Sequence, residues 1–212
     1  MGKEKIILIG GGGHARVVIE AIRLCGQYEI AGIVVSQPAE AASVSGVEVV
    51  GAIEDLPGLY AGGVQCAAIC IGSVGDTSVR ADFYRQVETA GFRFPPLVHP
   101  RAIVSPDAVL FEGAQVMAGA VVQTGGRIGA NAVINTAAVV EHDCIINNHA
   151  FIGPAAALLG DCVVGMGAFI GAGAIVLQKV RIGDYAVVAA GAVVIADIAA
   201  ASRVKGVPAR PY

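Results

Sequence analysis

The sequence predicts a small α/β unit with a parallel sheet, followed by a parallel β-helix built from six-residue repeats. Two observations lead to this prediction. Strand-like and helix-like segments alternate over the first 97 residues, and an aliphatic residue recurs at every sixth position from Val104 onward. We therefore expect an α/β domain over residues 1–97, a β-helix over 98–203 and a C-terminal tail over 204–212.

The six-residue repeat runs without a slip through sixteen hexads. This period fits neither an α-helix nor a plain strand, but it fits a solenoid in which three hexads form one triangular coil. The aliphatic residue fills the interior, and a small residue four positions later lets the corner close, with Val180 as the larger exception. The interior positions are Val104, Leu110, Val116, Val122, Ile128, Ile134, Val140, Ile146, Ile152, Leu158, Val164, Ile170, Val176, Ile182, Val188 and Val194.

The α/β unit begins with a buried strand, a glycine-rich turn and an amphipathic helix, all within KIILIGGGGHARVVIEAIRLCG (residues 5–26). Further strands are expected at YEIAGIVV (28–35) and CAAICIG (66–72), and a second helix at SVRADFYRQVETAG (78–91). Strands that alternate with helices in this way predict a Rossmann-like parallel sheet.

The glycine-rich turn from Gly10 to His14 offers bare amides at a helix N-terminus, where a phosphate group is favoured. Tight packing of the strand against the helix is the alternative reason for glycine there. A dinucleotide site would need an acidic residue at the end of the second strand. The chain has Val34, Val35 and Ser36 at this point, so we do not expect NAD to bind.

Three consecutive charged or titratable residues, Glu141, His142 and Asp143, interrupt the apolar repeat. They follow the interior Val140, so they fall on an outward-facing corner of the coil, where charge is solvated. Gly160 lies one coil later and is expected to stack over His142, leaving space and an unobstructed N–H that could stabilise an oxyanion. A histidine beside carboxylates is typical of a general base, although a solvated polar turn is the alternative.

Two other histidines have simpler interpretations. His149 lies in a polar turn, and His99 lies at the expected domain border. The sequence has no cluster with metal-ligand spacing and no obvious Ser or Cys nucleophile, so no metal is expected.

Composition excludes several classes of protein. A net charge of −3 gives no electrostatic footprint for nucleic acid, and the apolar runs are too short for a membrane-spanning helix. We expect no signal peptide. The five cysteines have no metal-type spacing and are expected to be buried, reduced thiols of a cytoplasmic protein.

Three segments, IILIGGGGHARVVIEAI, NTAAVVEHDC and GVPAR, resemble the sialic acid O-acetyltransferase-like family of hexapeptide-repeat sugar acetyltransferases. The resemblance runs the full length and is greatest to members that N-acetylate nucleotide-linked 4-amino-4,6-dideoxysugars. It implies a left-handed β-helix, a homotrimer with active sites between subunits, and acetyl-CoA as the acetyl donor.

The resemblance also implies residue roles. His142 matches the general base, Asp143 its acidic partner, and Gly160 the N–H donor to the thioester carbonyl. The nucleotide sugar would bind the α/β domain at Gly10, Gly12, Gly13, His14, Ser36, Gly72 and Arg80. Acetyl-CoA would contact Phe151, Gly160, Ala172, Ala190, Lys205 and Arg210.

The chain departs from the family pattern at two places. Members often carry a second histidine nine residues after the base, where this chain has Phe151, with His149 two residues earlier. Members that bind uridine nucleotides have an Asp pair after the second strand, where this chain has Ser36 and Gln37. The nucleotide, whether UDP, GDP or dTDP, therefore stays open.

Three alternative functions remain. The first is O-acetylation of sialic acid or a related sugar by the same base. The second is a non-catalytic solenoid scaffold. The third is a carbonic-anhydrase-like prism. It would require three metal-binding histidines, and His14, His99, His142 and His149 are spread over two domains, which counts against it.

Overall fold

The computed structural model describes residues 2–36 and 42–212, so Gln37 lies outside the described residues. It divides into two compact units. The first comprises Met1–Gly72 and Val79–Pro100, and the second comprises Ser73–Ser78 and Arg101–Tyr212. The main division lies close to the predicted border after residue 97, but the segment Ser73–Ser78 groups with the second unit.

The first unit is an α/β domain with a five-stranded sheet in the order β3-β4-β2-β1-β5. Strand β1 pairs in parallel with both β2 and β5, as the alternating pattern predicts, and β2 also pairs in parallel with β4. The helices and strands are β1 (Glu4–Ile9), α1 (Gly13–Cys25), β2 (Tyr28–Val35), β3 (Ser43–Val44), β4 (Val47–Ala52), η2 (Ile53–Asp55), α2 (Leu56–Ala61), β5 (Cys66–Ile69), α3 (Ser78–Thr89) and β6 (Leu97–Val98).

The hairpin β3–β4 and the helix α2 were not predicted. The hairpin turns at Ser45 and Gly46, which both have positive φ angles of 48° and 74°. This is the geometry of a two-residue hairpin turn, and alternating valines at 44, 47 and 49 flank it. The signal is present in the sequence but spans too few residues to stand out.

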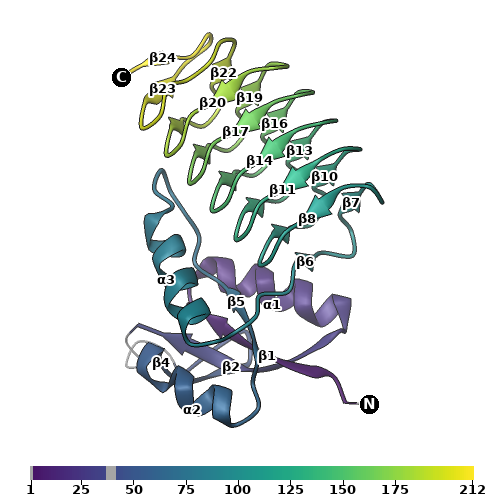
Figure 1. The fold of residues 1–212 in the computed structure, drawn as a ribbon, viewed down its shortest axis with the longest axis vertical. Coiled ribbons are helices and arrows are strands. Elements are labelled where there is room, and N and C mark those ends of the chain that lie inside the picture. Colours follow the sequence, from purple (N-terminus) through teal and green to yellow (C-terminus); the bar gives the residue numbers. More distant parts are fainter. Residues whose placement is uncertain (1, 37–41) are drawn as a thin grey trace. The chain divides into compact units, whose positions relative to one another are not determined.

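The second unit is a parallel β-helix of hexapeptide repeats, and Figure 1 shows its coils stacked along one axis. Three sheets form its sides, and the hexad strands from β7 to β22 pair with the strands eighteen residues away, as in Val121↔Val139 and Val139↔Ala157. The first side contains β7 (Ile103–Val104), β10 (Val121–Val122), β13 (Val139–Val140), β16 (Ala157–Leu158), β19 (Ile175–Val176) and β22 (Val193–Val194).

The second side contains β8 (Val109–Leu110), β11 (Arg127–Ile128), β14 (Ile145–Ile146), β17 (Val163–Val164) and β20 (Arg181–Ile182). The third contains β9 (Gln115–Val116), β12 (Val133–Ile134), β15 (Phe151–Ile152), β18 (Phe169–Ile170) and β21 (Val187–Val188). Two further strands, β23 (Arg203–Lys205) and β24 (Arg210–Pro211), extend this third sheet.

The predicted interior positions from Val116 to Val194 are all buried, with at most 2% of each side chain exposed. The small residues that follow them are buried as well, and Val180 is 5% exposed. Val104 and Leu110 are only half-buried because they belong to the first coil, which has no coil beneath it. The six-residue period thus places one aliphatic and one small residue of each hexad inside the prism.

The expected C-terminal tail is not a free tail. Strand β23 pairs in parallel with β21, and β24 folds back on β23 in antiparallel fashion through Val204↔Pro211 and Lys205↔Arg210. The hairpin continues the ladder of the third sheet beyond the last hexad.

Among the described residues, no helix is both long and apolar enough to cross a membrane. The cysteines are free thiols: Cys66, Cys70, Cys144 and Cys162 are buried, and Cys25 is half-buried.

A matched pair of isoleucines tests the interior of the β-helix. Ile146 is 1% exposed and its neighbour Ile145 on β14 is 38% exposed. Ile146→Ala should cost about 2–5 kcal/mol because it leaves a cavity in a rigid stack, whereas Ile145→Ala should cost less than about 1 kcal/mol. Chemical denaturation measures both, and equal losses would contradict the assignment of faces.

Candidate functional site

The glycine-rich turn joins β1 to α1 at the carboxyl edge of the parallel sheet. Gly10 has φ +104°, and a Cβ there would lie 2.8 Å from Cγ1 of Ile71, so glycine is required for both conformation and space. By contrast, a Cβ at Gly12 or Gly13 would meet nothing within 4 Å. Gly12 is the N-cap of α1 and provides no side-chain cap, so the first amides of the helix face an open space.

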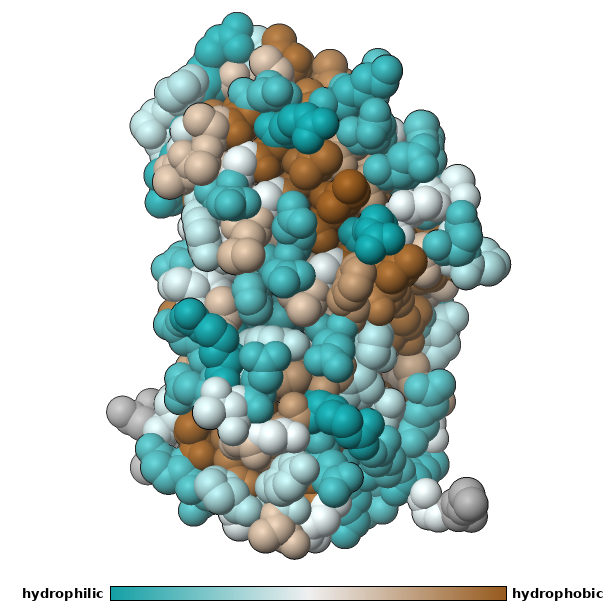
Figure 2. Space-filling view, in the orientation of Figure 1, coloured by the Kyte–Doolittle hydropathy of each residue, from teal (hydrophilic) through white to brown (hydrophobic). Residues whose placement is uncertain are grey.

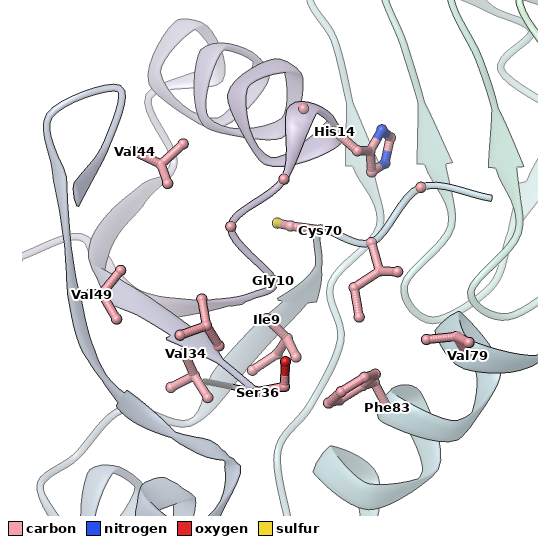
Figure 3. Close-up of a pocket in the computed structure, with 16 residues that line it drawn as sticks. Ile9, Gly10, His14, Val34, Ser36, Val44, Val49, Cys70, Val79 and Phe83 are labelled. Carbon is pink, nitrogen blue, oxygen red and sulfur yellow. The ribbon is translucent and has the colours of Figure 1, made fainter. Parts of the chain in front are cut away.

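This open space is a pocket of about 590 Å³, a size suited to a small molecule. Figure 3 shows its walls, with His14 at the start of α1 and Val79 and Phe83 on α3. The predicted residues Gly10, Gly12, Gly13, His14, Ser36 and Gly72 all line it. The sequence interpretation missed its aliphatic and aromatic walls, formed by Ile9, Val34, Val35, Val44, Val49, Ile71, Val79 and Phe83.

Arg80 was expected at this pocket but does not line it. Its side chain is 1% exposed, and Nη1 donates hydrogen bonds to the carbonyl oxygens of Ile69 and Ile71, at 2.8 and 2.9 Å. Burial lowers the pKa of this guanidinium to about 10. Arg80 therefore holds the segment at the end of β5 that forms one wall of the pocket.

The charged triplet lies in the turn between β13 and β14, on an outward corner of the β-helix as predicted. His142 Nδ1 and Asp143 Oδ2 are 3.0 Å apart, and the two side chains are 56% and 67% exposed. With Nδ1–H donating to this carboxylate, Nε2 carries the free lone pair. We call these two side chains the His142–Asp143 dyad.

Gly160 stacks on His142, as the eighteen-residue offset predicts. A Cβ at Gly160 would lie 2.3 Å from Nε2 and 2.5 Å from Cε1 of His142, so the imidazole lies directly against the glycine backbone. Within the described residues, the Gly160 N–H donates to no backbone carbonyl. Its neighbour Asp161 does: Asp161 N–H donates to the His142 carbonyl at 2.9 Å.

The surroundings of His142 are acidic. Its pKa is raised above the ordinary value, chiefly by the hydrogen bond to Asp143; burial, the second-largest effect, lowers it, and the charges of Asp143, Glu141 and Asp161 raise it further. The imidazole is therefore a stronger base than a free imidazole in water. Asp161 was not identified from the sequence, although it lies eighteen residues after Asp143.

Phe151 and His149 lie away from the triplet's turn. Phe151 is 5% exposed on β15, and its ring stacks with Phe169 at 5.5 Å between centroids. His149 lies in the next turn, where its Nδ1 is 3.0 Å from Nδ2 of Asn131. These contacts give both residues a packing role in the chain itself.

The other residues expected at acetyl-CoA lie in the later coils. Ala172 and Ala190 are exposed and occupy equivalent positions on successive coils, as predicted. Lys205 and Arg210 are a register pair in the β23–β24 hairpin, with Lys205 Nζ 4.5 Å from the centre of the Tyr212 ring.

No group of three or more His, Cys, Asp or Glu side chains in the described residues is arranged to hold a metal ion. His99 is 3% exposed near the end of the first unit, with Nε2 4.0 Å from Oε1 of Glu20.

Family models match both halves of the chain. The PglD N-terminal domain matches residues 5–87, and the bacterial transferase hexapeptide (six repeats) matches residues 161–196.

Solved structures of sugar acetyltransferases are similar over the whole length. PerB from Caulobacter crescentus, in complex with CoA and GDP-perosamine, is 42% identical with a TM-score of 0.92, covering 100% of this chain and 98% of that one. A histidine-to-asparagine variant of perosamine N-acetyltransferase from Caulobacter crescentus, also in complex with CoA and GDP-perosamine, is 41% identical with a TM-score of 0.93, covering 100% and 97%. The acetyltransferase domain of PglB from Neisseria gonorrhoeae FA1090, in complex with acetyl coenzyme A, is 36% identical with a TM-score of 0.90, covering 100% of both chains.

A β-helix with a histidine–aspartate pair on one corner, joined to an α/β domain with an open glycine-rich pocket, defines a hexapeptide-repeat acyltransferase. The chain belongs to the sialic acid O-acetyltransferase-like, PglD-type family of hexapeptide-repeat sugar acetyltransferases.

The dyad makes a prediction about titration. Since the hydrogen bond to Asp143 is the largest cause of the raised His142 pKa, Asp143→Asn should lower that pKa, and the imidazole should stay neutral to a lower pH. Asp161→Asn, which removes the smallest of these contributions, should lower it less. The NMR titration of the His142 ring protons measures both, and the reverse order would contradict the assigned geometry.

Proposed function

We propose that the chain transfers the acetyl group of acetyl-CoA to the 4-amino group of a nucleotide-linked aminodideoxysugar. The observation that carries the proposal is the His142–Asp143 dyad lying on the Gly160 backbone. It combines a base with a free Nε2, a carboxylate that fixes its tautomer, and an N–H from the stacked turn of the next coil. The relatives with bound CoA and GDP-perosamine support the same reaction class.

The acetyl group would pass directly from donor to acceptor. The amine nitrogen attacks the thioester carbonyl carbon, and His142 Nε2 accepts the proton that the nitrogen loses. The Gly160 N–H faces the oxygen that becomes negative, which is where a preorganised donor stabilises the transition state. The C–S bond then breaks, and the imidazolium returns the proton to the departing CoA thiolate. The products are an N-acetyl sugar and CoA.

The charges around His142 favour an amine over a sugar acid. Glu141, Asp143 and Asp161 all contribute negative charge at this corner. A 4-amino sugar arrives largely as an ammonium, which this field attracts and which loses one proton to solvent before its nitrogen attacks the thioester. The carboxylate of sialic acid would be repelled. O-acetylation of sialic acid by the same base remains the second candidate function, and the acidic corner counts against it.

The nucleotide would occupy the glycine-rich pocket of the α/β domain. Its diphosphate suits the uncapped amides at Gly12, Gly13 and His14. Its base suits the apolar walls, and Ser36 lies at the end of β2, where a dinucleotide-binding site would have an acidic residue. Because the relatives at 41–42% identity carry GDP-perosamine, GDP is the nucleotide that we propose.

Acetyl-CoA would extend along the β-helix past Ala172 and Ala190, towards Lys205 and Arg210, with Phe151 as a further contact. In the proposed homotrimer, the β-helix of a neighbouring subunit would cover the bound acetyl-CoA. Figure 2 shows a band of hydrophobic residues on the β-helix. Among the outward-facing strand residues, Ile103, Val109 and Ile175 are 67%, 39% and 39% exposed, which supports burial against other copies.

A cytoplasmic location fits this function. The thiols of Cys66, Cys70, Cys144 and Cys162 are buried and unpaired in disulfides, a state that a reducing compartment maintains.

Thiol release from acetyl-CoA tests the proposed function. The purified protein should release CoA with a GDP-linked 4-amino-4,6-dideoxysugar, and less or none with UDP- or dTDP-linked amino sugars and free sialic acid. His142→Ala should lower kcat by about 10²–10⁴-fold because general-base catalysis is lost, with acetyl-CoA affinity nearly unchanged. Release with sialic acid alone would establish the O-acetyltransferase. Near-normal kcat in His142→Ala would remove this residue from the reaction, and silence with every acceptor would favour the scaffold.

A further inference from the structure

The turn one coil before the His142–Asp143 dyad is built to receive the Asp143 carboxylate. Thr124 and Gly125 occupy this turn, eighteen residues before His142 and Asp143. The Thr124 carbonyl accepts the Asp143 N–H at 3.0 Å, so the two turns are joined through the backbone.

Gly125 lies directly against the Asp143 side chain. A Cβ at Gly125 would lie 2.4 Å from Oδ1 and 3.4 Å from Cγ of Asp143. Real Cβ atoms do not approach another heavy atom so closely, so any side chain at position 125 would displace the carboxylate. Oδ2 of that same carboxylate lies 3.0 Å from His142 Nδ1.

Conformation alone does not explain this glycine. Gly125 has φ +70°, but the equivalent turn position holds alanine elsewhere in the β-helix, at Ala137, Ala155 and Ala201, with φ of 56°, 54° and 56°. The backbone of these turns therefore accepts an alanine. The feature particular to position 125 is the carboxylate above it.

Asp107, one coil further back, fixes the same turn. Its Oδ2 accepts hydrogen bonds from Thr124 Oγ1 at 2.6 Å and from the Gly125 N–H at 3.2 Å, and its Oδ1 accepts one from Ser105 Oγ at 2.6 Å. The carboxylate thus holds both residues of the turn on which Asp143 rests.

We propose that Gly125, held by Asp107, is a positioning residue for the general base: its missing side chain leaves room for the Asp143 carboxylate to orient His142. The two members of the dyad then rest on two glycines of neighbouring coils, Asp143 on Gly125 and His142 on Gly160. The catalytic part of this inference rests on the proposed function, whereas the effect on the His142 pKa does not.

Gly125→Ala tests this inference, with Gly119→Ala as the matched control. Gly119 has φ +69°, and its Cβ would meet only Ala137 at 3.8 Å. Gly125→Ala should lower kcat/KM about 10- to 100-fold, the effect of losing one charge-assisted hydrogen bond, and should lower the His142 pKa. Gly119→Ala should change kcat/KM less than about twofold.

A double-mutant cycle separates positioning from general damage. In an Asp143→Ala background there is no carboxylate to displace, so adding Gly125→Ala should change kcat/KM less than about twofold. An equal loss in the native and Asp143→Ala backgrounds would overturn the proposal.

The NMR titration of His142 keeps the test independent of the substrate. If no acceptor supports acetyl transfer, the proposed function fails, yet Gly125→Ala must still lower the His142 pKa. An unchanged His142 pKa in a folded Gly125→Ala protein would overturn the positioning role. Asp107→Ala provides a second route without the steric clash and should shift the His142 pKa in the same direction. An unchanged pKa in that variant would remove Asp107 from the proposal.

Discussion

The eighteen-residue register of the β-helix ladder determines where the chemistry lies. Each coil donates and accepts backbone hydrogen bonds with the coils next to it, so every turn residue stacks on its equivalent eighteen positions away. The Asp143 N–H binds the Thr124 carbonyl, and the Asp161 N–H binds the His142 carbonyl. Since a buried aliphatic column fixes this register, a residue at one corner is set by its neighbours in the coils before and after.

Much of the β-helix site could be predicted because its period is strict. An aliphatic residue at every sixth position places His142 on an outward corner and Gly160 over it, and the structure confirms both placements. The same eighteen-residue offset places Thr124, Gly125 and Asp161 at this corner, but their residue types alone did not indicate a role in the site. The hydrogen bonds of Asp107 and the packing of Phe151 against Phe169 depend on side-chain conformation, which no period encodes.

The α/β domain was less predictable because its sheet is formed by contacts between distant segments. The strand–glycine–helix pattern identifies β1 and α1, but the hairpin β3–β4 has only a Ser45–Gly46 turn and three alternating valines as a signal. Arg80 shows the same limit. From the sequence, a cation on a helix next to a phosphate-binding turn is expected to bind the ligand. In the structure, the Arg80 guanidinium is buried and donates to the Ile69 and Ile71 carbonyls, so its role is structural.

A crystal structure of the protein with CoA and a GDP-linked 4-amino sugar would test the account most directly. It should place the acceptor nitrogen within about 2.6–3.2 Å of His142 Nε2, with the CoA sulfur beside the Gly160 N–H and the GDP in the glycine-rich pocket. An amine that binds away from His142, or a nucleotide outside this pocket, would contradict the central claim that the coil register assembles the acetyl-transfer site.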